Sequence, residues 1–286
     1  MASKRELDAS SFPGRLRRLS QRIIWRLGRL AIPIAPWLSA RVKNAPRPLV
    51  RLGTEYGGWT IVQPTAEASQ MYAVLCGAGE DISLDLALQA KFDLFCVIAD
   101  PTPRAIAHWQ KINDDKAQGI PTPINGNPKE TYSTASVNFS KIEYKCVAVW
   151  TAEAELKFWT PANPKHVSHS AVNLQKTDSF IVVPANTLDK ISNQPPSMVE
   201  IVKLDVEGAG LIIVNWMIDN KYLPNQILVE IEECLYPSSR KFDRVKSSLK
   251  RLEECGYDLV HFDGIANCTF VKHGSERYPK KESYAA

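Results

Sequence analysis

The sequence has no long hydrophobic run and no closely paired cysteines. No stretch of its 286 residues approaches the roughly 18 uncharged apolar residues of a transmembrane helix, so no membrane span is expected. None of the six cysteines forms a CxxC pair, and four lie in apolar runs that resemble strands. This pattern is typical of buried free thiols in a reducing compartment, so we expect a cytoplasmic protein.

The body of the chain also lacks an excess of positive charge. Residues 1–50 contain 11 Lys and Arg against 2 acids, and the remaining residues contain 24 against 29. The net charge of +4 is therefore +9 in the N-terminal arm and −5 elsewhere. A mildly acidic body argues against nucleic acid as a partner.

The basic arm has helical periodicity. In residues 14–40 apolar side chains recur at helical spacing with arginines between them, which predicts a basic amphipathic helix broken by Pro33 and Pro36. The charges interrupt any signal-peptide core. Two interpretations remain open. In the first, the helix contacts a membrane surface or a partner, and the protein is peripheral at a membrane. In the second, the helix packs on the domain with its arginines in water. We expect an arm at 1–45, one domain at 46–273 and a disordered tail at 274–286.

The rest of the chain is organised around residues 72–109. An apolar run over Tyr72–Cys76 predicts a buried strand that ends at Gly77 and Gly79, and residues 82–92 predict an amphipathic helix. A second apolar run ends at Asp100, 21 residues after Gly79. A nucleotide-binding βαβ unit places a carboxylate on ribose hydroxyls at about this offset.

The glycine turn lacks the third glycine of a dinucleotide fold. In its place Glu80 and Asp81 follow the turn, and two carboxylates would repel a pyrophosphate. They suit a ligand with an ammonium and a sulfonium, which favours S-adenosyl-L-methionine over NAD. The alternative is that both acids are first-turn partners of the helix dipole.

Five further apolar runs predict strands, at 142–150, 198–204, 226–231, 257–262 and 268–272. With helices between the first five strands, the expected fold is α/β, a doubly wound Rossmann-like sheet of seven strands. This sheet is mostly parallel with an antiparallel edge hairpin, and the basic N-terminal helix is additional to it. An inserted hairpin is expected near 151–197.

Several candidate site residues follow predicted strands. Asp205 directly ends a strand, with Glu207 two positions on; the alternative for this pair is first-turn capping of the next helix. Glu230 ends the next strand, and Ala148 is expected beside an adenine. The insertion contains a polar cluster with His166, His169 and Ser170. No acid or cysteine at metal spacing accompanies the histidines, so we expect a hydrogen-bonding loop near the substrate and no metal.

These segments resemble the FkbM family of methyltransferases. The most specific likeness is VEIVKLDVEGAG at 199–210 followed by ILVEIEE at 227–233, and AGED, DPTPRAI, NPKHVSHS and GYDLVHF are similar to further family segments. The resemblance covers about residues 70–272. The chain departs from the family at Gly210, where a glutamate is usual, and it lacks an aspartate inside the strand over Tyr72–Cys76.

The resemblance implies a class I enzyme that transfers methyl from S-adenosyl-L-methionine to a hydroxyl of a sugar, glycan or secondary metabolite. The expected bases are Asp205 or Glu207, with His166 or His169 as competitors, and the expected substrate-binding residues are His169, Ser170 and Glu230. The expected cofactor-binding residues are Gly77, Ala78, Gly79, Glu80, Asp81, Asp100, Pro101 and Ala148. Two other hypotheses remain, an NAD or nucleotide-sugar enzyme, and a non-catalytic membrane-associated binding protein on a methyltransferase scaffold. The sequence gives no oligomeric state.

Overall fold

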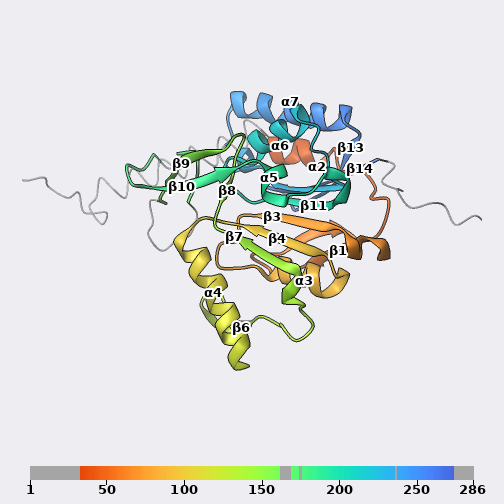
Figure 1. Ribbon diagram of the computed structural model, residues 1–286. Helices are drawn as coiled ribbons and strands as arrows, with labels where there is room; N and C mark the ends of the chain where they lie inside the picture. The colour runs from red at the N-terminus through yellow and green to blue at the C-terminus, as the bar shows by residue number, and fades with distance from the viewer. Residues whose placement is uncertain (1–32, 162–168, 174–175, 236, 274–286) are drawn as a thin grey trace, which may run out of the picture.

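The computed structural model describes residues 33–161, 169–173, 176–235 and 237–273, and it is built around a seven-stranded sheet (Figure 1). The strands of this sheet, in chain order, are β3 (Tyr72–Cys76), β4 (Phe95–Ala99), β7 (Ile142–Lys145), β11 (Val199–Leu204), β12 (Gln226–Glu230), β13 (Tyr257–Phe262) and β14 (Asn267–Lys272). They lie in the order β13-β14-β12-β11-β3-β4-β7. The five neighbouring strands β12, β11, β3, β4 and β7 are parallel, and β14 is antiparallel to both of its neighbours. The predicted mostly parallel sheet with an antiparallel edge hairpin is therefore confirmed.

The strand order reverses between β3 and β11. From β3 the chain continues outward to β4 and β7, and it then returns to the other side of β3 as β11 and β12. All five residues of β4 and all six of β11 are apolar or buried, as expected of strands covered on both faces. In open α/β sheets such a reversal leaves a crevice outside the carboxyl ends of the strands, where ligands bind. The chain topology thus positions the site.

Helices and a hairpin cover the two faces of the sheet (Figure 1). One face packs against α2 (Ile34–Ser39), α5 (Leu188–Ser192), α6 (Gly210–Asp219) and α7 (Ser239–Glu254). The other packs against α3 (Ser83–Phe92), α4 (Pro103–Gln118) and the antiparallel hairpin of β1 (Leu49–Leu52) and β2 (Trp59–Val62). Short 3₁₀ turns are η1 (Ala66–Gln70), η2 (Phe139–Lys141), η3 (Pro196–Met198) and η4 (Glu232–Cys234). No helix of the described residues has the length and apolar character needed to cross a membrane.

The helix α3 was expected to be amphipathic, and this is wrong. Its polar residues Asp85 and Gln89 are as buried as its leucines, because α3 packs against the sheet and is also contacted by β1 and η1. Gln89 compensates by accepting a hydrogen bond from the amide of Asn138. On the same face α4 continues to Gln118, and a small antiparallel pair follows it, β5 (Pro123–Ile124) and β6 (Asn127–Thr131).

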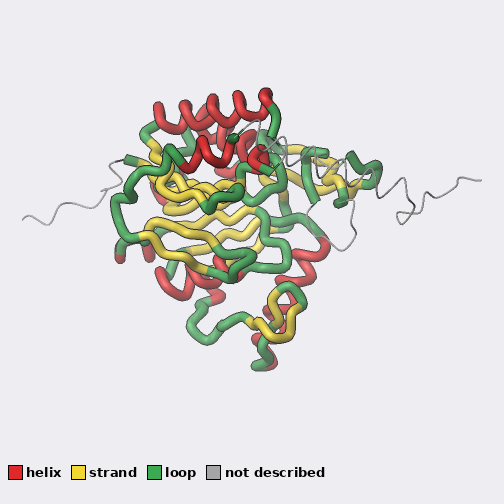
Figure 2. Tube along the Cα trace, turned by 180° about the vertical axis from the view of Figure 1, so that it is seen from behind, coloured by secondary structure: helices red, strands yellow, loops and turns green. Residues whose placement is uncertain are grey.

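The strand expected over residues 142–150 is divided between two sheets. β7 ends at Lys145, and β8 (Ala148–Val149) pairs with β10 (Phe180–Asn186) in a three-stranded sheet that β9 (Ala154–Trp159) completes. The turn between β7 and β8 exposes Cys146, in contrast to the buried thiol that we expected. The antiparallel β9–β10 pair confirms the inserted hairpin, and this small sheet projects beside the main one (Figure 2).

Pro36 does not break the helix in which it lies. It is in the first turn of α2, where a backbone N–H has no intrahelical partner, so proline is tolerated there. Ile34 and Leu38 are buried in the main core, and the amide of Lys43 bonds to the carbonyl of Leu259. The described part of the arm therefore packs against the domain. The rest of the predicted basic helix and the tail lie outside the described residues, and the three domain boundaries stay predictions.

Candidate active site

A pocket of about 210 Å³ opens at the carboxyl ends of β3, β4, β11 and β12, at the reversal of strand order. The predicted site residues that line it are Gly77, Ala78, Gly79, Glu80, Asp81, Asp100, Pro101, Ala148, His169, Asp205, Glu207 and Glu230. Ser170 lies directly behind the pocket, where its hydroxyl donates to the carbonyl of Glu207. His166 lies outside the described residues. The fold thus gathers residues that are up to 153 positions apart, from Gly77 to Glu230.

The glycine turn follows β3 and forms the floor of the pocket. Gly77 has φ +86° and Gly79 has φ +55°, in the left-handed region that glycine adopts readily. A Cβ on Gly77 would lie 1.8 Å from the carbonyl oxygen of Asp205, so the backbones of two strand ends approach each other only because this residue has no side chain. This is the tight turn that the sequence predicted.

The two acids after the turn already have protein partners. Glu80 forms an ion pair with Arg104. Asp81 accepts from the hydroxyl of Thr54 at 2.5 Å and from the amide of Ser83 at 3.0 Å. These bonds attach the β1–β2 hairpin to the start of α3, and they place both carboxylates on the wall of the pocket as parts of the structure.

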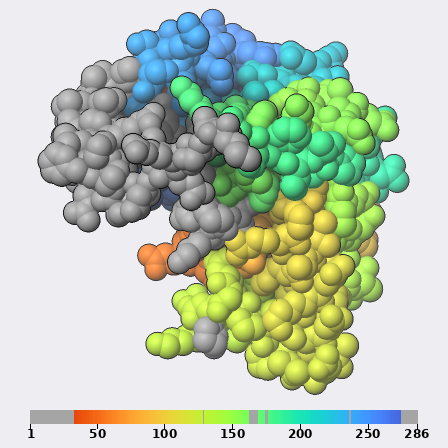
Figure 3. All heavy atoms as spheres, turned by 90° about the vertical axis from the view of Figure 1, so that its left-hand side faces the viewer, coloured from red at the N-terminus to blue at the C-terminus, as the bar shows by residue number. Residues whose placement is uncertain are grey.

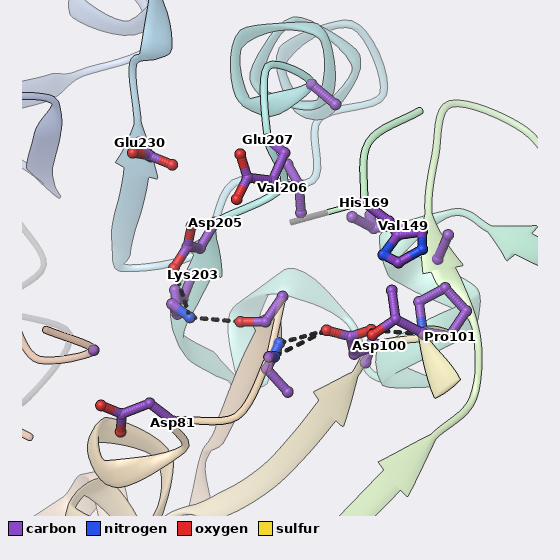
Figure 4. A pocket seen from close by; sticks show the side chains of 18 of the residues that line it. Asp81, Asp100, Pro101, Val149, His169, Lys203, Asp205, Val206, Glu207 and Glu230 are labelled. Atoms are coloured by element: carbon purple, nitrogen blue, oxygen red, sulfur yellow. Dashed lines mark hydrogen bonds and ion pairs between the residues drawn. The ribbon is translucent and has the colours of Figure 1, made fainter. Parts of the chain in front are cut away.

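Asp100 is similarly engaged with the backbone. Its Oδ2 accepts from the amides of Ala78 at 2.9 Å and Gly79 at 3.0 Å, and its Oδ1 accepts from the amide of Thr102 at 2.8 Å and the hydroxyl of Thr102 at 2.6 Å. Figure 4 shows the carboxylate directed toward the glycine turn. Asp100 therefore links the turn after β3 to the start of α4.

The opposite wall of the pocket is more apolar. It is lined by Pro101, Ala148, Val149, Phe158 and His169. Figure 4 shows the imidazole of His169 near Val149 and Pro101, across the pocket from Asp205 and Glu230. Ala148, Val149, Phe158 and His169 come from the segment that includes the small sheet, which lies between α7 and α4 in the space-filling view (Figure 3). This wall is apolar enough to pack against an aromatic ring.

A buried lysine connects the floor of the pocket to its acidic wall, and the sequence analysis missed it. The ammonium of Lys203 donates to the carbonyl of Gly77 at 2.7 Å and lies 3.2 Å from Oδ2 of Asp205. Burial lowers the pKa of Lys203, but the charges of Asp205 and Asp85 outweigh burial and raise it overall, so Lys203 stays charged. A lysine one residue before the end of the buried strand β11 was the signal in the sequence.

Lys203 also interacts electrostatically with Asp85, which is only 1% exposed. Neither carboxylate oxygen has a hydrogen-bond partner within the described part of the chain, and burial raises the pKa of Asp85 to about 6. The charge of Lys203 partly offsets this effect. The two residues form a buried pair of opposite charges beneath the pocket.

Four carboxyl groups cluster beside the pocket, on Asp205, Glu207, Glu230 and Glu232. Burial, followed by the charges of Asp205, Glu232 and Glu207, raises the pKa of Glu230 well above its usual range, and a hydrogen bond with Asp205 contributes. Burial and a similar interaction with Glu207 raise the pKa of Glu232. Because like charges this close cannot all ionise, the cluster holds protons at neutral pH. Glu232 was not among the predicted site residues; it follows β12 in η4.

The backbone at Glu207 is strained. Glu207 has φ +49°, a conformation that non-glycine residues rarely adopt and that is found disproportionately at functional sites. The Glu207 side chain lines the pocket, and Glu207 precedes α6, which begins at Gly210. Helix capping therefore does not account for its position.

Tyr56 and Trp59 of the β1–β2 hairpin have different environments. Trp59 is a packing residue that is only 3% exposed. Tyr56, in contrast, is 75% exposed and lines the mouth of the pocket. Partial desolvation of its hydroxyl, and then the charges of Asp205 and Glu207, raise the pKa of Tyr56. The hydroxyl therefore lies close to the acidic wall.

The described residues contain no group of three His, Cys, Asp or Glu side chains arranged to hold a metal ion. His166, and with it the HxxH pattern of the insertion, lies outside the described residues.

The seven-stranded, mostly parallel sheet with helices on both faces and a pocket at its reversal point is compatible with a Rossmann-like methyltransferase fold. The sequence profile described as "Methyltransferase FkbM domain" matches residues 96–259, which are 164 of the 286 residues. The chain therefore belongs to the FkbM family of methyltransferases. The match begins inside β4 and so does not include the glycine turn. A comparison with curated proteins found no match.

Proposed function

We propose that the protein transfers a methyl group from S-adenosyl-L-methionine to a hydroxyl of a sugar, a glycan or a secondary metabolite. The observation that carries this proposal is the charge of the pocket. Among its described lining residues are six carboxylic side chains, on Glu80, Asp81, Asp100, Asp205, Glu207 and Glu230, and one lysine; the acids outnumber the lysine even though Glu230 is protonated and Glu80 is paired with Arg104. This surrounding favours a cationic sulfonium and disfavours a pyrophosphate, so it supports S-adenosyl-L-methionine over NAD or a nucleotide sugar.

The residues fit this methyl donor. The backbone of Gly77, Ala78 and Gly79, which lines the pocket, would lie against its amino acid end. Pro101 and Ala148 would lie against the adenine on the apolar wall. The expected contacts of Glu80 and Asp81 with the ammonium stay predictions, and both acids already hold other groups in place.

When bound, S-adenosyl-L-methionine supplies an activated methyl group on a positively charged sulfur. The residues of this chain then need to hold the acceptor oxygen in line with the sulfur–methyl bond and to accept its proton. Asp205 and Glu207 lie on the wall beside the glycine turn and are the candidates for this base. The oxygen gains the methyl group, and the carboxylate takes the proton. Glu230 keeps its own proton, so it serves better as a hydrogen-bond donor to the acceptor than as a base.

Two features suggest the class of acceptor. The acidic wall disfavours acceptors with a carboxylate or phosphate near the reacting hydroxyl. The exposed ring of Tyr56 at the mouth offers a flat surface on which the apolar face of a sugar ring can stack, with carboxyl groups nearby for its hydroxyls. A neutral or cationic sugar or polyol is therefore the proposed acceptor. His169 and Glu230 are the proposed contacts to it, and Ser170 supports Glu207 from behind.

Calorimetric titration with S-adenosylhomocysteine, and with NAD in parallel, tests the cofactor. We expect binding of S-adenosylhomocysteine alone. The variant D205N should keep that affinity and lose methyl transfer to an acceptor found by screening hydroxylated sugars. Binding of neither ligand by the wild type would favour the other hypothesis, a non-catalytic binding protein on this scaffold.

A cytoplasmic location and a membrane contact of the Arg-rich arm are further proposals. They rest on the free thiols and on the charge pattern of residues 1–50. Flotation with liposomes that contain anionic lipid, with and without residues 1–32, tests the contact. The shorter form keeps α2, whose Ile34 and Leu38 belong to the core. Equal behaviour of both forms would exclude the membrane contact.

A further inference from the structure

Resting on the proposed function, we propose that Lys203 is a positioning residue that holds the carboxylate of Asp205 beside the glycine turn, in the orientation needed to take the acceptor proton. Methyl transfer from a sulfonium to a hydroxyl does not itself require a lysine beside the base. Of the two candidate bases, Asp205 is the one whose ion pair with Lys203 the structure shows. The contacts, the burial and the charge of Lys203 indicate its role.

Lys203 reaches from one central strand to the turn after the neighbouring strand. In the register of β11 and β3 it lies opposite Leu75, close to the end of β3. Its ammonium donates to the carbonyl of Gly77 at 2.7 Å and lies 3.2 Å from Oδ2 of Asp205 (Figure 4). One side chain thus joins the turn that would contact the methyl donor to the carboxylate that would take the proton.

The backbone of Asp205 is fixed without Lys203, but its side chain is not. The amide of Asp205 donates to the carbonyl of Cys76 at 3.1 Å, which anchors the strand end. The Asp205 side chain is 35% exposed, and several staggered rotamers are open to an exposed aspartate. A hydrogen bond with Glu230 restrains the carboxylate from the side of β12, and Lys203 restrains it from the side of the turn. Because the Lys203 side chain is only 3% exposed, this restraint leaves the pocket side of the carboxylate open to a substrate.

The stability of the fold does not account for a lysine at this position. All six residues of β11 are buried, and removing an ammonium from water is costly. The charges of Asp205 and of Asp85, on α3, offset part of this cost. Replacing a buried pair of opposite charges with neutral side chains of similar size is often neutral or stabilising. The variant K203M/D85N should therefore fold and keep the Tm of the wild type or exceed it.

A comparison of methyl transfer with ligand binding tests the inference. Methionine has nearly the length of lysine but carries no charge and donates no hydrogen bond. For an acceptor found by screening hydroxylated sugars, we expect K203M and K203M/D85N to lower kcat about 100-fold, because a displacement of about 1 Å has an effect of this size. The affinity for S-adenosylhomocysteine should fall at most about threefold, since the turn loses one hydrogen bond and the amide of Gly77 keeps its bond to the carbonyl of Ala99.

The matched control is K145M, at the end of the neighbouring parallel strand β7. The Lys145 ammonium pairs with Glu143 at 3.3 Å and is not among the described residues that line the pocket, so kcat should not change. Unchanged kcat in K203M/D85N would overturn the inference. Equal losses of kcat and of S-adenosylhomocysteine affinity would also overturn it, because Lys203 would then act in binding the methyl donor.

A double-mutant cycle shows whether Lys203 acts through Asp205. In the D205N background, K203M should lower the residual rate of methyl transfer no further, because the base that Lys203 positions is already absent. A further loss of about 100-fold would mean that the two residues act independently, and it would refute the positioning role.

A crystal structure of K203M/D85N gives a result that does not depend on activity. The Asp205 side chain should leave its wild-type rotamer or occupy more than one, whereas the backbone of Gly77 and Asp205 should stay in place. A single, unchanged Asp205 rotamer would refute the inference. Failure of the wild type to bind S-adenosylhomocysteine would overturn the proposed function, and the rotamer would still decide whether Lys203 holds Asp205.

Discussion

Raising the pH from about 6 to about 8 should destabilise the protein through Glu230 and Glu232. Both side chains have raised pKa values in the folded state, for which burial is the largest cause. In the unfolded chain they ionise near their ordinary value of about 4.3. Between the two values the folded state binds more protons than the unfolded state, so the free energy of unfolding falls as the pH rises.

The variant E230Q isolates this effect. Glutamine can donate a hydrogen bond toward Asp205 as the protonated glutamate does, but it cannot ionise. One proton difference changes the free energy of unfolding by about 1.4 kcal/mol per pH unit, so E230Q should gain up to about 2.7 kcal/mol relative to wild type across this range. That gain corresponds to about 5–10 °C in Tm. Contributions from Asp85 and the histidines cancel, because they are present in both proteins.

Urea denaturation followed by tryptophan fluorescence at several pH values measures the difference. The matched control is E254Q, at an exposed glutamate whose side chain is 62% accessible; its curve should parallel that of the wild type. Parallel curves for wild type and E230Q would refute the view that Glu230 is protonated in the folded state.

Two further predictions concern the pocket. Replacing Tyr56 with alanine should raise the KM for a sugar acceptor about tenfold and leave the affinity for S-adenosylhomocysteine unchanged. The variant Y56F should keep most of the acceptor affinity, because the ring remains. Equal KM values for wild type and Y56A would exclude a stacking role. G77A should abolish S-adenosylhomocysteine binding and lower Tm, since its Cβ would lie 1.8 Å from the carbonyl oxygen of Asp205. The control is G256A. Gly256 has a similar φ of +83°, and a Cβ there would meet no atom within 4 Å, so this variant should lose only about 1–2 kcal/mol of the free energy of unfolding to backbone strain. Similar losses of stability in the two variants would contradict the steric argument.

Much of the sheet could be predicted from the sequence because five of its seven strands, β3, β4, β11, β12 and β13, are mainly apolar runs that end at a glycine or an acid. Tyr72–Cys76 before Gly77 and the run before Asp205 are examples, and both form buried central strands. The run over residues 142–150 was misread as one strand, because hydrophobicity does not show where a chain passes from one sheet to another. The amphipathic prediction for α3 failed because its polar residues are buried by distant parts of the chain: Asp85 interacts with Lys203, and Gln89 accepts from the amide of Asn138.

The site could be predicted where a residue follows a strand directly, as Asp205 and Glu230 do. It could not be predicted where the role depends on distant partners. Lys203 bonds to Gly77, 126 positions away, and nothing next to it in the sequence indicates that contact. Tyr56 is a similar case, since its exposure depends on how the hairpin lies across the mouth of the pocket.

The division of the chain between β7 and β8 determines how the insertion could be exchanged with that of a related enzyme. β8 contributes Ala148 and Val149 to the pocket, and it pairs with Ala185 and Asn186 of β10. A graft of residues 151–197 would thus separate a pocket wall from the strand that supports it. A graft from 146 to 187 would transfer both together, so a chimera designed to change acceptor preference would also carry a new wall on the adenine side.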